Sequence, residues 1–237
     1  MDIDFHFVTT NYDCNLERLL KQEDVKFTDD LPARTTHIDH QNRNWRLSNS
    51  LVFRFDEMTN IVKLHGSTNW YQLTGADTRS GMLGACQYNL SPGKAFFSSV
   101  VCDRRLFRPF SSPLMLRGSI SKPSAYARNP YSKLIAAFED VLEISDLVIV
   151  AGFGWSDTGL SLRLFRYAHL QGNLLAIDGS SPLAISKAPG FEDWKVANPG
   201  EQNLEHQPFA VVREHMSSLK KGAIRSVLEK LLGPKRH

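Results

Sequence analysis

The stretch NPYSKLIAAFEDVLEISDLVIVAGFG, residues 129–154, joins a helical pattern directly to a strand pattern. The run DLVIVAG (146–152) is continuously apolar, as are strands that lie buried on both faces of a parallel sheet. This juxtaposition predicts an α/β fold with a parallel sheet. The helix is predicted to be amphipathic, because apolar residues recur at helical spacing at Leu134, Ile135, Phe138, Val141 and Leu142.

The alternation of helix and strand continues towards the C-terminus. A second helix is predicted over 158–170, with Asp157 placed to cap it. The segment NLLAIDGSSP (173–182) follows as another buried strand that ends in a turn. This order predicts right-handed βαβ units and therefore a Rossmann-like, doubly wound parallel sheet.

The stretch DFHFVTTNYDCNLERLL (4–20) begins the same way near the start of the chain. It predicts a strand over 5–9, then a polar corner, then a helix over 15–21. The apolar face of this helix is predicted to consist of Leu16, Leu19 and Leu20. Two interpretations fit the corner: Asn11 and Asp13 take part in chemistry, or Asn11 turns the chain and Asp13 caps the helix.

The next part of the chain gives weaker signals. Residues 22–50 are polar and aperiodic, so a loop is predicted there. Two short strands are predicted to follow in LVFRF (51–55) and NIVKLHGSTNW (60–70), and the second strand ends at His65. This histidine fits the role of a general base, but composition alone favours a half-buried residue that hydrogen-bonds a neighbouring strand.

Two further segments depart from the α/β pattern. Residues 71–120 show little periodicity and are interpreted as an irregular insertion. Residues 205–237 are interpreted as a C-terminal helical segment, with its helix over 215–232 and the stop signal Gly-Pro just beyond. The whole chain, 1–237, is interpreted as a single domain.

Composition excludes several classes of function. The formal net charge is +3 and the basic residues are scattered, which argues against direct nucleic-acid binding. No apolar run approaches the roughly 20 residues that span a bilayer, and the first residues lack the pattern of a signal peptide. Three cysteines without a C-x-x-C pair argue against a disulfide framework and a zinc ribbon. We therefore expect a cytoplasmic protein without membrane contact.

Polar residues follow three of the predicted strands, in TTNYD (9–13), KLHGS (63–67) and AGFGWSD (151–157). Parallel sheets bind ligands outside the carboxyl ends of their strands, so the three ends are expected to converge. In the third, Gly152 and Gly154 permit the phosphates or ribose of a nucleotide to approach the backbone. As a dinucleotide fingerprint this turn is incomplete, because Asp157 stands where the third glycine would be.

Taken together, these segments resemble the SIR2-like (sirtuin-related) NAD-binding family, and in particular its bacterial branch found in anti-phage defence proteins. The residues 10–13, Thr-Asn-Tyr-Asp, are similar to the sirtuins' Gln-Asn-Ile-Asp, and 64–66 match their Leu-His-Gly. GFGWSD (152–157) resembles the Gly-x-x-x-x-Asp turn of the bacterial branch, and RGSISKPSAYARNPY (117–131) also looks like that branch. The implied fold is the DHS-like NAD/FAD-binding form of the Rossmann-like sheet.

The resemblance implies a reaction: hydrolysis of NAD⁺ at the bond between nicotinamide and ribose. It assigns Asn11 to orienting water and His65 to accepting a proton, a step worth a factor of about 10²–10⁴ in rate. Asp13 would hold the corner or contact the carboxamide. NAD is then the substrate rather than a resident cofactor. The residues implied in binding it are Thr10, Gly152, Gly154, Asp157 and Asp178. For Asp157 a helix cap, and for Asp178 a turn, are equally good interpretations.

The departures from the family also carry predictions. Sirtuin deacylases hold zinc with two C-x-x-C pairs, which this chain lacks, so no zinc site is expected and lysine deacylation is disfavoured. The family opens with a strand and a Gly-Ala-Gly-x-Ser loop well before the asparagine motif, yet Asn11 comes ten residues after Met1. The first strand of the fold is therefore expected to be missing. Three explanations fit this departure: the chain is a truncated form, a second subunit supplies the strand, or the chain is a module that has lost full NAD binding.

Three functions remain open at this point. The first is an NAD⁺ glycohydrolase that serves as an anti-phage effector. The second is an inactive module that binds ADP-ribose or another nucleotide. The third is an interaction module within a homo-oligomer or a larger defence assembly.

Overall fold

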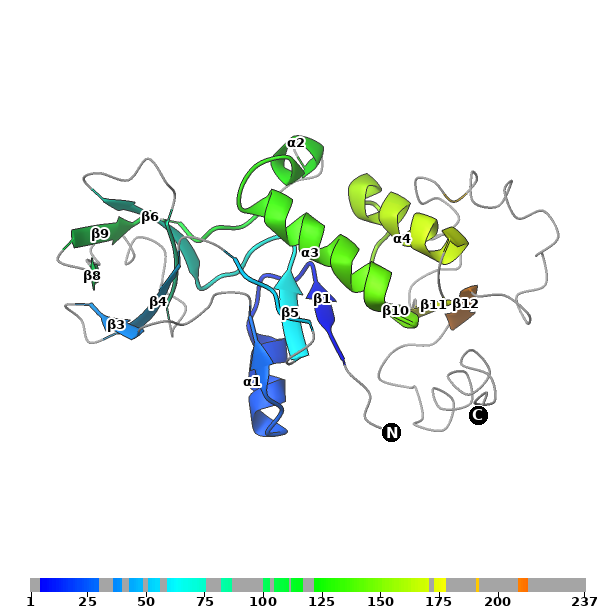
Figure 1. Cartoon of the computed structure of the whole chain (residues 1–237), viewed down its shortest axis with the longest axis horizontal. Helices are drawn as coiled ribbons and strands as arrows, with labels where there is room; N and C mark the ends of the chain where they lie inside the picture. Colours follow the sequence, from blue (N-terminus) through cyan, green and yellow to red (C-terminus); the bar gives the residue numbers. More distant parts are fainter. Residues whose placement is uncertain are drawn as a thin grey trace. The chain divides into compact units, whose positions relative to one another are not determined.

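The computed structural model is a mixed α/β structure that divides into two compact units, Met1–Phe138 and Glu139–His237. Each unit contains a three-stranded parallel sheet, and the first also contains a six-stranded antiparallel sheet (Figure 1). The interpretation of the chain as one domain stays a prediction. The structure describes residues 5–29, 36–39, 43–48, 51–55, 59–75, 82–86, 100–102, 105–110, 112–116, 122–170, 173–177, 191 and 209–212.

The parallel sheet of the first unit has the order β1-β5-β2, formed by Phe7–Thr9, Thr59–Lys63 and Phe27–Thr28. Strand β1 and the helix α1, Asn15–Gln22, confirm the strand and the helix predicted near the start of the chain. In the register of β1 and β5, Thr9 lies opposite Lys63. The segments that follow these two strands therefore leave the sheet at neighbouring positions on its carboxyl edge.

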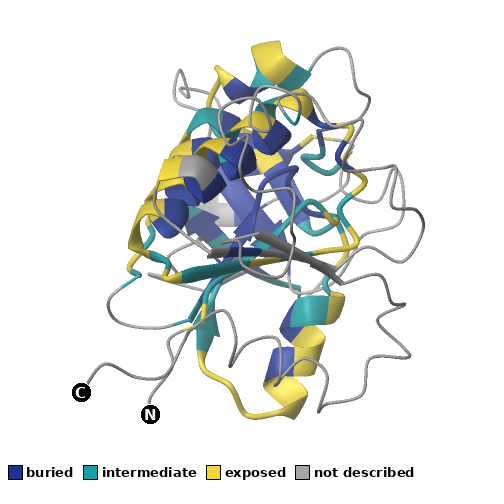
Figure 2. Ribbon diagram, turned by 90° about the vertical axis from the view of Figure 1, so that its right-hand side faces the viewer, coloured by how far each residue is buried: buried dark blue, intermediate teal, exposed yellow. Residues whose placement is uncertain are grey.

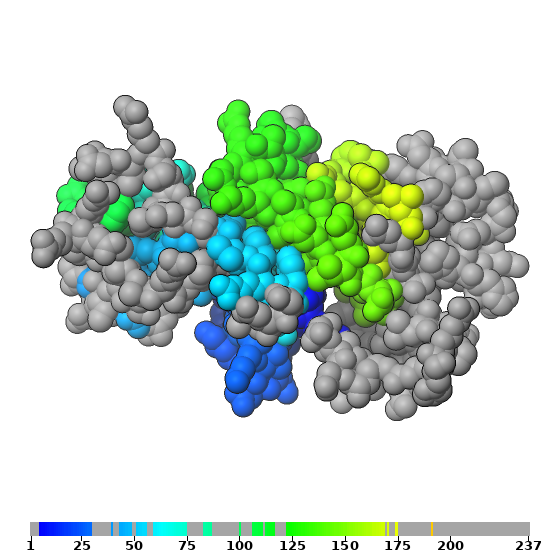
Figure 3. Space-filling view, viewed as in Figure 1, coloured from blue at the N-terminus to red at the C-terminus, as the bar shows by residue number. Residues whose placement is uncertain are grey.

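Helix α1 differs from its predicted amphipathic pattern. Leu20 is buried, as expected, but Leu19 is 53% exposed and the acidic Glu17 is buried. The prediction of Leu19 on the buried face is therefore wrong. The helix turns Glu17 inward because its carboxylate pairs with the buried ammonium of Lys63, at 2.6 Å. Figure 3 shows α1, in blue, projecting from the first unit.

The antiparallel sheet has the order β3-β4-β7-β6-β9-β8. Asp39, just after β3, forms an antiparallel bridge with Val100 at the start of β8. This bridge joins the two outermost strands, so the sheet closes on itself as a small barrel. Its core contains Trp45, Leu47, Tyr71, Leu73, Cys86, Val100 and Phe107. Its strands are β3 Thr36–Ile38, β4 Asn44–Ser48, β6 Trp70–Gly75, β7 Met82–Cys86, β8 Val100–Cys102 and β9 Arg105–Pro109.

The barrel corrects two predictions. The segments 22–50 and 71–120 were predicted to be a loop and an irregular insertion, yet their described residues supply its strands. These strands are three to six residues long. The alternation of apolar and polar residues along them is therefore too short to give a clear signal in the sequence. The segment 51–55 forms no strand, and Phe53 and Phe55 stack there instead. Strand β5 ends at Lys63, two residues before the predicted end at His65.

The second unit contains a parallel sheet of order β10-β11-β12. Strand β10 (Leu147–Ala151), helix α4 (Thr158–Leu170) and strand β11 (Asn173–Ile177) form a βαβ unit and confirm the predicted elements. The backbone N–H of Leu160 donates to the Asp157 carboxylate at 3.3 Å, which confirms the predicted cap. Strand β12, Phe209–Val212, shows that the segment 205–237 is not helical throughout. The helix predicted over 215–232 lies outside the described residues.

Helix α3, Tyr131–Ile144, confirms the helical pattern of residues 129–154. It follows a short helix α2, Lys122–Tyr126, and begins in the first unit and ends in the second. Figure 2 shows buried positions along one side of the helices and exposed positions along the other. The apolar residues that predicted α3 are all buried, namely Leu134, Ile135, Phe138, Val141 and Leu142.

Strand β10 is less buried than predicted. Ile149 in its middle is 45% exposed, so burial on both faces is wrong for this strand. In the described part of the chain β10 pairs only with β11 and lies at the edge of its sheet. Leu174 on the central strand β11 is fully buried, as the pattern requires. No helix in the described ranges has the length and apolarity needed to cross a bilayer.

Asp39, the residue that forms the closing bridge of the barrel, has a buried carboxylate. It accepts hydrogen bonds from the Arg43 backbone N–H at 3.0 Å, from Arg43 Nε at 2.7 Å and from Trp45 Nε1 at 3.0 Å. We expect Asp39→Ala to lower the free energy of unfolding by about 3 kcal/mol, because it leaves buried donors unpaired. Urea unfolding measures this, with Asp140→Ala on the exposed side of α3 as the control. Equal losses in the two variants would contradict the assignment.

A second prediction concerns Tyr167 in α4. Burial, with a smaller contribution from Asp146, raises the pKa of its hydroxyl from 10.0 to about 12, and the hydroxyl donates to the Ser145 carbonyl at 2.8 Å. Between pH 10 and about 12, the folded state therefore keeps the Tyr167 hydroxyl proton that the unfolded chain has lost. Stability is unaffected below pH 10 and falls between pH 10 and about 12.

In this range the free energy of unfolding falls by at most about 1.4 kcal/mol per pH unit for each such tyrosine. Burial also raises the pKa of Tyr131 to about 12, so two tyrosines contribute. We expect Tyr167→Phe to reduce the slope measured by urea unfolding between pH 9 and 12, and Tyr167→Phe/Tyr131→Phe to reduce it further. An unchanged slope in both variants would refute this assignment.

Candidate active site

Two polar segments meet at the carboxyl edge of the first unit's parallel sheet. One is the corner after β1, residues 10–13, and the other is the histidine turn after β5, residues 64–67. The N–H of Leu64 donates to the Thr9 carbonyl at 2.9 Å, and the N–H of Thr68 donates to the Tyr12 carbonyl at 2.8 Å. The predicted convergence of these two strand ends is therefore confirmed. Thr10, Asn11, Asp13 and His65 all belong to this part of the structure.

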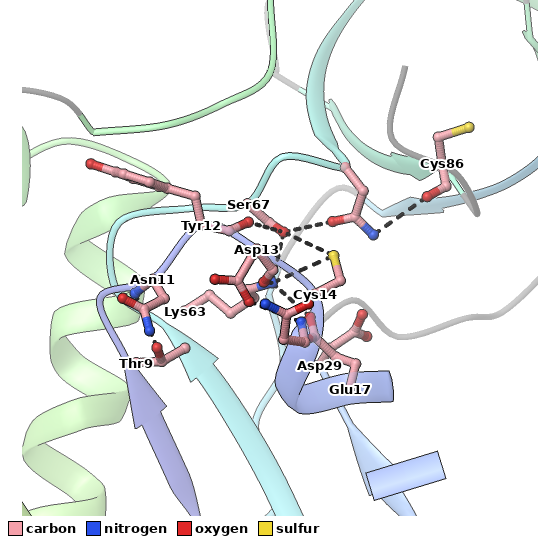
Figure 4. Close-up of polar contacts among 12 residues, drawn as sticks. Thr9, Asn11, Tyr12, Asp13, Cys14, Glu17, Asp29, Lys63, Ser67 and Cys86 are labelled. Carbon is pink, nitrogen blue, oxygen red and sulfur yellow. Dashed lines mark hydrogen bonds and ion pairs between the residues drawn. The ribbon is translucent and has the colours of Figure 1, made fainter. Parts of the chain in front are cut away.

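The corner presents one amide to its surroundings. Asn11 is exposed, and its backbone N–H donates to the Thr9 hydroxyl at 3.0 Å (Figure 4). Within the described residues its side-chain amide makes no hydrogen bond. Asp13 accepts a hydrogen bond from the Asn15 N–H at 2.9 Å, in the turn that leads into α1. The N-cap position is occupied by Cys14, which makes no side-chain capping hydrogen bond, so the prediction that Asp13 caps the helix is wrong. The Asp13 carboxylate has a structural task in this turn, while the Asn11 side chain has no such task.

His65 is held in a different environment. It is only 4% exposed, and its Nε2 shares a hydrogen bond of 2.8 Å with the Tyr126 hydroxyl. The two rings are nearly parallel, with centroids 6.1 Å apart, and the Tyr12 ring lies 6.2 Å from the histidine. The tyrosine hydroxyl can pass a proton to or from the imidazole. Sequence reasoning missed Tyr126 as a partner, although it lies inside the quoted segment 117–131.

A short segment, residues 114–116, fixes the histidine turn from the other side. The N–H of Ser67 donates to the Leu114 carbonyl at 3.1 Å, and the N–H of Leu116 donates to the His65 carbonyl at 2.8 Å. The Tyr12 hydroxyl donates to the Leu116 carbonyl, so the same segment also contacts the corner. The positions of Tyr12 and His65 are thus set by backbone hydrogen bonds rather than by side-chain packing alone.

A buried ammonium lies below the corner. Lys63 Nζ donates to the Asp13 carbonyl and to Glu17 Oε1, both at 2.6 Å, and to the Ser67 hydroxyl at 2.7 Å (Figure 4). The lysine is 1% exposed, so its charge is compensated by Glu17 and by these oxygens rather than by water. The network ties the corner, α1 and the histidine turn to the last residue of β5.

The third predicted strand end lies in the second unit, in the turn between β10 and α4. Gly152 has a φ of +63°, and a Cβ added at Gly152 or at Gly154 would meet no atom within 4 Å. The backbone there is open to a ligand. The Asp157 carboxylate, however, already caps α4 and lies at its positive end, so a phosphate is disfavoured and a neutral hydroxyl is favoured.

One residue of this turn is strained. Trp155 has a φ of +55°, is 2% exposed, and stacks on Phe165 with centroids 5.5 Å apart. Its carbonyl accepts a hydrogen bond from the Ser161 hydroxyl at 3.1 Å. A left-handed backbone conformation is costly for tryptophan. It persists here because the buried ring holds the residue in place. The remaining predicted binding residue, Asp178, lies outside the described residues.

Comparison with known proteins adds no assignment, since neither a family model nor a curated protein matches this sequence. Among the described residues, no group of three or more His, Cys, Asp and Glu side chains is arranged to hold a metal ion.

Gly66 tests how tightly the histidine turn is fixed. Its φ is +83°, and an added Cβ would lie 2.1 Å from the Leu114 carbonyl oxygen. We expect Gly66→Ala to lower the free energy of unfolding by about 2 kcal/mol or more. The matched control is Gly154→Ala, which meets open space and should stay within about 0.5 kcal/mol of the parent. Urea unfolding measures the free energy of unfolding of both variants. An unchanged value for Gly66→Ala would show that residues 114–116 do not fix the histidine turn.

Proposed function

We propose that this chain is a SIR2-like domain with a Rossmann-like, doubly wound sheet that hydrolyses NAD⁺ between nicotinamide and ribose. One observation supports this above the others. An exposed amide without a hydrogen-bond partner among the described residues, Asn11, and a histidine paired with a tyrosine, His65, follow neighbouring parallel strands. Sheets of this kind bind substrates at that edge.

The reaction needs few groups. Nicotinamide leaves with the electron pair of the C1′–N bond, a cation develops on the ribose, and water adds to C1′. The Asn11 amide orients that water and adds no charge of its own. His65 accepts a proton from a ribose hydroxyl or from the water, with Tyr126 completing the path. Asp13 holds the corner, because its carboxylate accepts a hydrogen bond from the Asn15 N–H.

The rest of the dinucleotide is assigned to the remaining predicted residues. Thr10 lies beside Asn11 in the corner and contacts the nicotinamide side. The resemblance to the SIR2-like family also assigns Gly152 and Gly154 to ligand binding, and their backbone is open. By the same resemblance, Asp157 and Asp178 bind hydroxyl groups of the adenosine ribose. In this proposal the protein is a cytoplasmic anti-phage effector that acts as a homo-oligomer or within a larger assembly.

One observation favours a second candidate, a module that binds ADP-ribose without cleaving NAD⁺. His65 is 4% exposed and already pairs with Tyr126, as a purely structural histidine would. In this case the same edge of the sheet holds the ribose, and Asn11 provides a hydrogen bond rather than a water for attack.

The test is nicotinamide release from NAD⁺ by the full chain, followed by chromatography. We expect Asn11→Ala and His65→Gln each to lower the rate by a factor of about 10²–10⁴. The glutamine keeps a hydrogen bond to Tyr126, so a loss there reports proton transfer rather than misfolding. Asn15→Ala, in the first turn of α1, is the matched control and should retain full activity.

Two results would reject the hydrolase. Release at background by the parent chain, together with binding of ADP-ribose in calorimetry, favours the binding module. Background release without binding of ADP-ribose rejects both candidates. Circular dichroism of each variant shows that its fold is retained.

A further inference from the structure

A thiol and a buried amine lie next to each other under the corner. Cys14 Sγ is 3.8 Å from Lys63 Nζ and 3.7 Å from the Ser67 hydroxyl (Figure 4). Cys14 is partly exposed, so a small molecule in solvent can reach its sulfur, whereas Lys63 is 1% exposed. Neither side chain contacts the substrate or moves a proton in the proposed hydrolysis. Their pairing therefore calls for its own explanation.

Glu17 provides a second, independent observation. It is 8% exposed, and its Oε1 lies 2.6 Å from Lys63 Nζ. Its other oxygen, Oε2, is buried and has no hydrogen-bond partner among the described residues. An unpaired buried carboxylate oxygen is costly, and a redox or catalytic role is one explanation for it. The Glu17 carboxylate can therefore accept a proton from Lys63, and the Lys63 amine lies beside the Cys14 thiol.

Exposure and position favour reaction at Cys14 over the buried cysteine. Cys14 is partly exposed, and its sulfur lies 3.8 Å from the Lys63 amine. Cys86, by contrast, is 1% exposed and packs in the core of the barrel. The chain thus contains its own internal control.

We propose that Cys14 and Lys63 form a covalent sulfenamide cross-link when the protein meets hydrogen peroxide. The Cys14 sulfur first attacks one peroxide oxygen, the O–O bond breaks, and a sulfenic acid and water result. Sulfur is oxidised and peroxide is reduced in this step. Lys63 passes one ammonium proton to Glu17 and attacks the sulfur with its nitrogen lone pair. The S–O bond breaks, and the departing hydroxide takes a second proton from nitrogen and leaves as water.

The bond connects two positions that matter for the candidate active site. Cys14 comes three residues after Asn11, and Lys63 two residues before His65. The cross-link fixes the start of α1 to the end of β5 and so ties the corner to the histidine turn. Thiols such as dithiothreitol reverse it, because a thiolate attacks the S–N bond at sulfur and the amine leaves.

The experiment treats the full native chain with hydrogen peroxide, digests it and identifies peptides by mass spectrometry. We expect one new species that joins the Cys14 and Lys63 peptides, with the sum of their masses less two hydrogens. It disappears after dithiothreitol. Cys14→Ser abolishes it, Cys86→Ala retains it, and the parent chain oxidised in urea does not form it, because the two groups are then no longer adjacent.

A trapping reagent adds an independent readout. Dimedone labels sulfenic acids, so Lys63→Gln should raise the labelling of Cys14 above that of the parent. Three outcomes would overturn the proposal: Cys14 oxidised without any link to Lys63, Cys14 unmodified while the other cysteines react, or a linked pair whose mass retains an oxygen.

Discussion

The ammonium of Lys63 is the constraint on which the first unit depends. A buried lysine charge is tolerated only if acceptors surround it, and three oxygens from three different segments do so here, from Asp13, Glu17 and Ser67. Satisfying one charge therefore fixes the corner, the first helix and the histidine turn together. It also explains why α1 turns an acidic residue inward and leaves Leu19 exposed.

The predictions that proved correct concern segments with a strong local pattern. Helices α3 and α4 were predicted from apolar residues at helical spacing, and strands β10 and β11 from continuous apolar runs. The barrel was not, because its strands are short and its inward residues, such as Trp45 and Leu47, alternate with polar ones over only five positions. Its closure depends on Asp39 and Val100, which are far apart in sequence and carry no local signal.

The candidate site shows the same division. The neighbourhood of Asn11 and His65 could be predicted, because parallel strands place their carboxyl ends at one edge. The helix cap of Asp157 could be predicted too, since capping is a local interaction. The predicted cap at Asp13 was wrong, because Cys14 occupies the N-cap of α1. The pairing of His65 with Tyr126 and the network of Lys63 could not, because each joins residues that are more than 40 positions apart. Such contacts follow from packing, which a single sequence does not reveal.

The charges around the corner bear on the proposed chemistry. Cleaving the nicotinamide bond builds positive charge on the ribose, so an uncompensated cation under Asn11 would oppose the reaction. Glu17 compensates Lys63 at 2.6 Å, and the pair is close to neutral as seen from outside. Asn11 itself is uncharged. The corner thus places a neutral amide, rather than an uncompensated cation, where positive charge develops in the transition state.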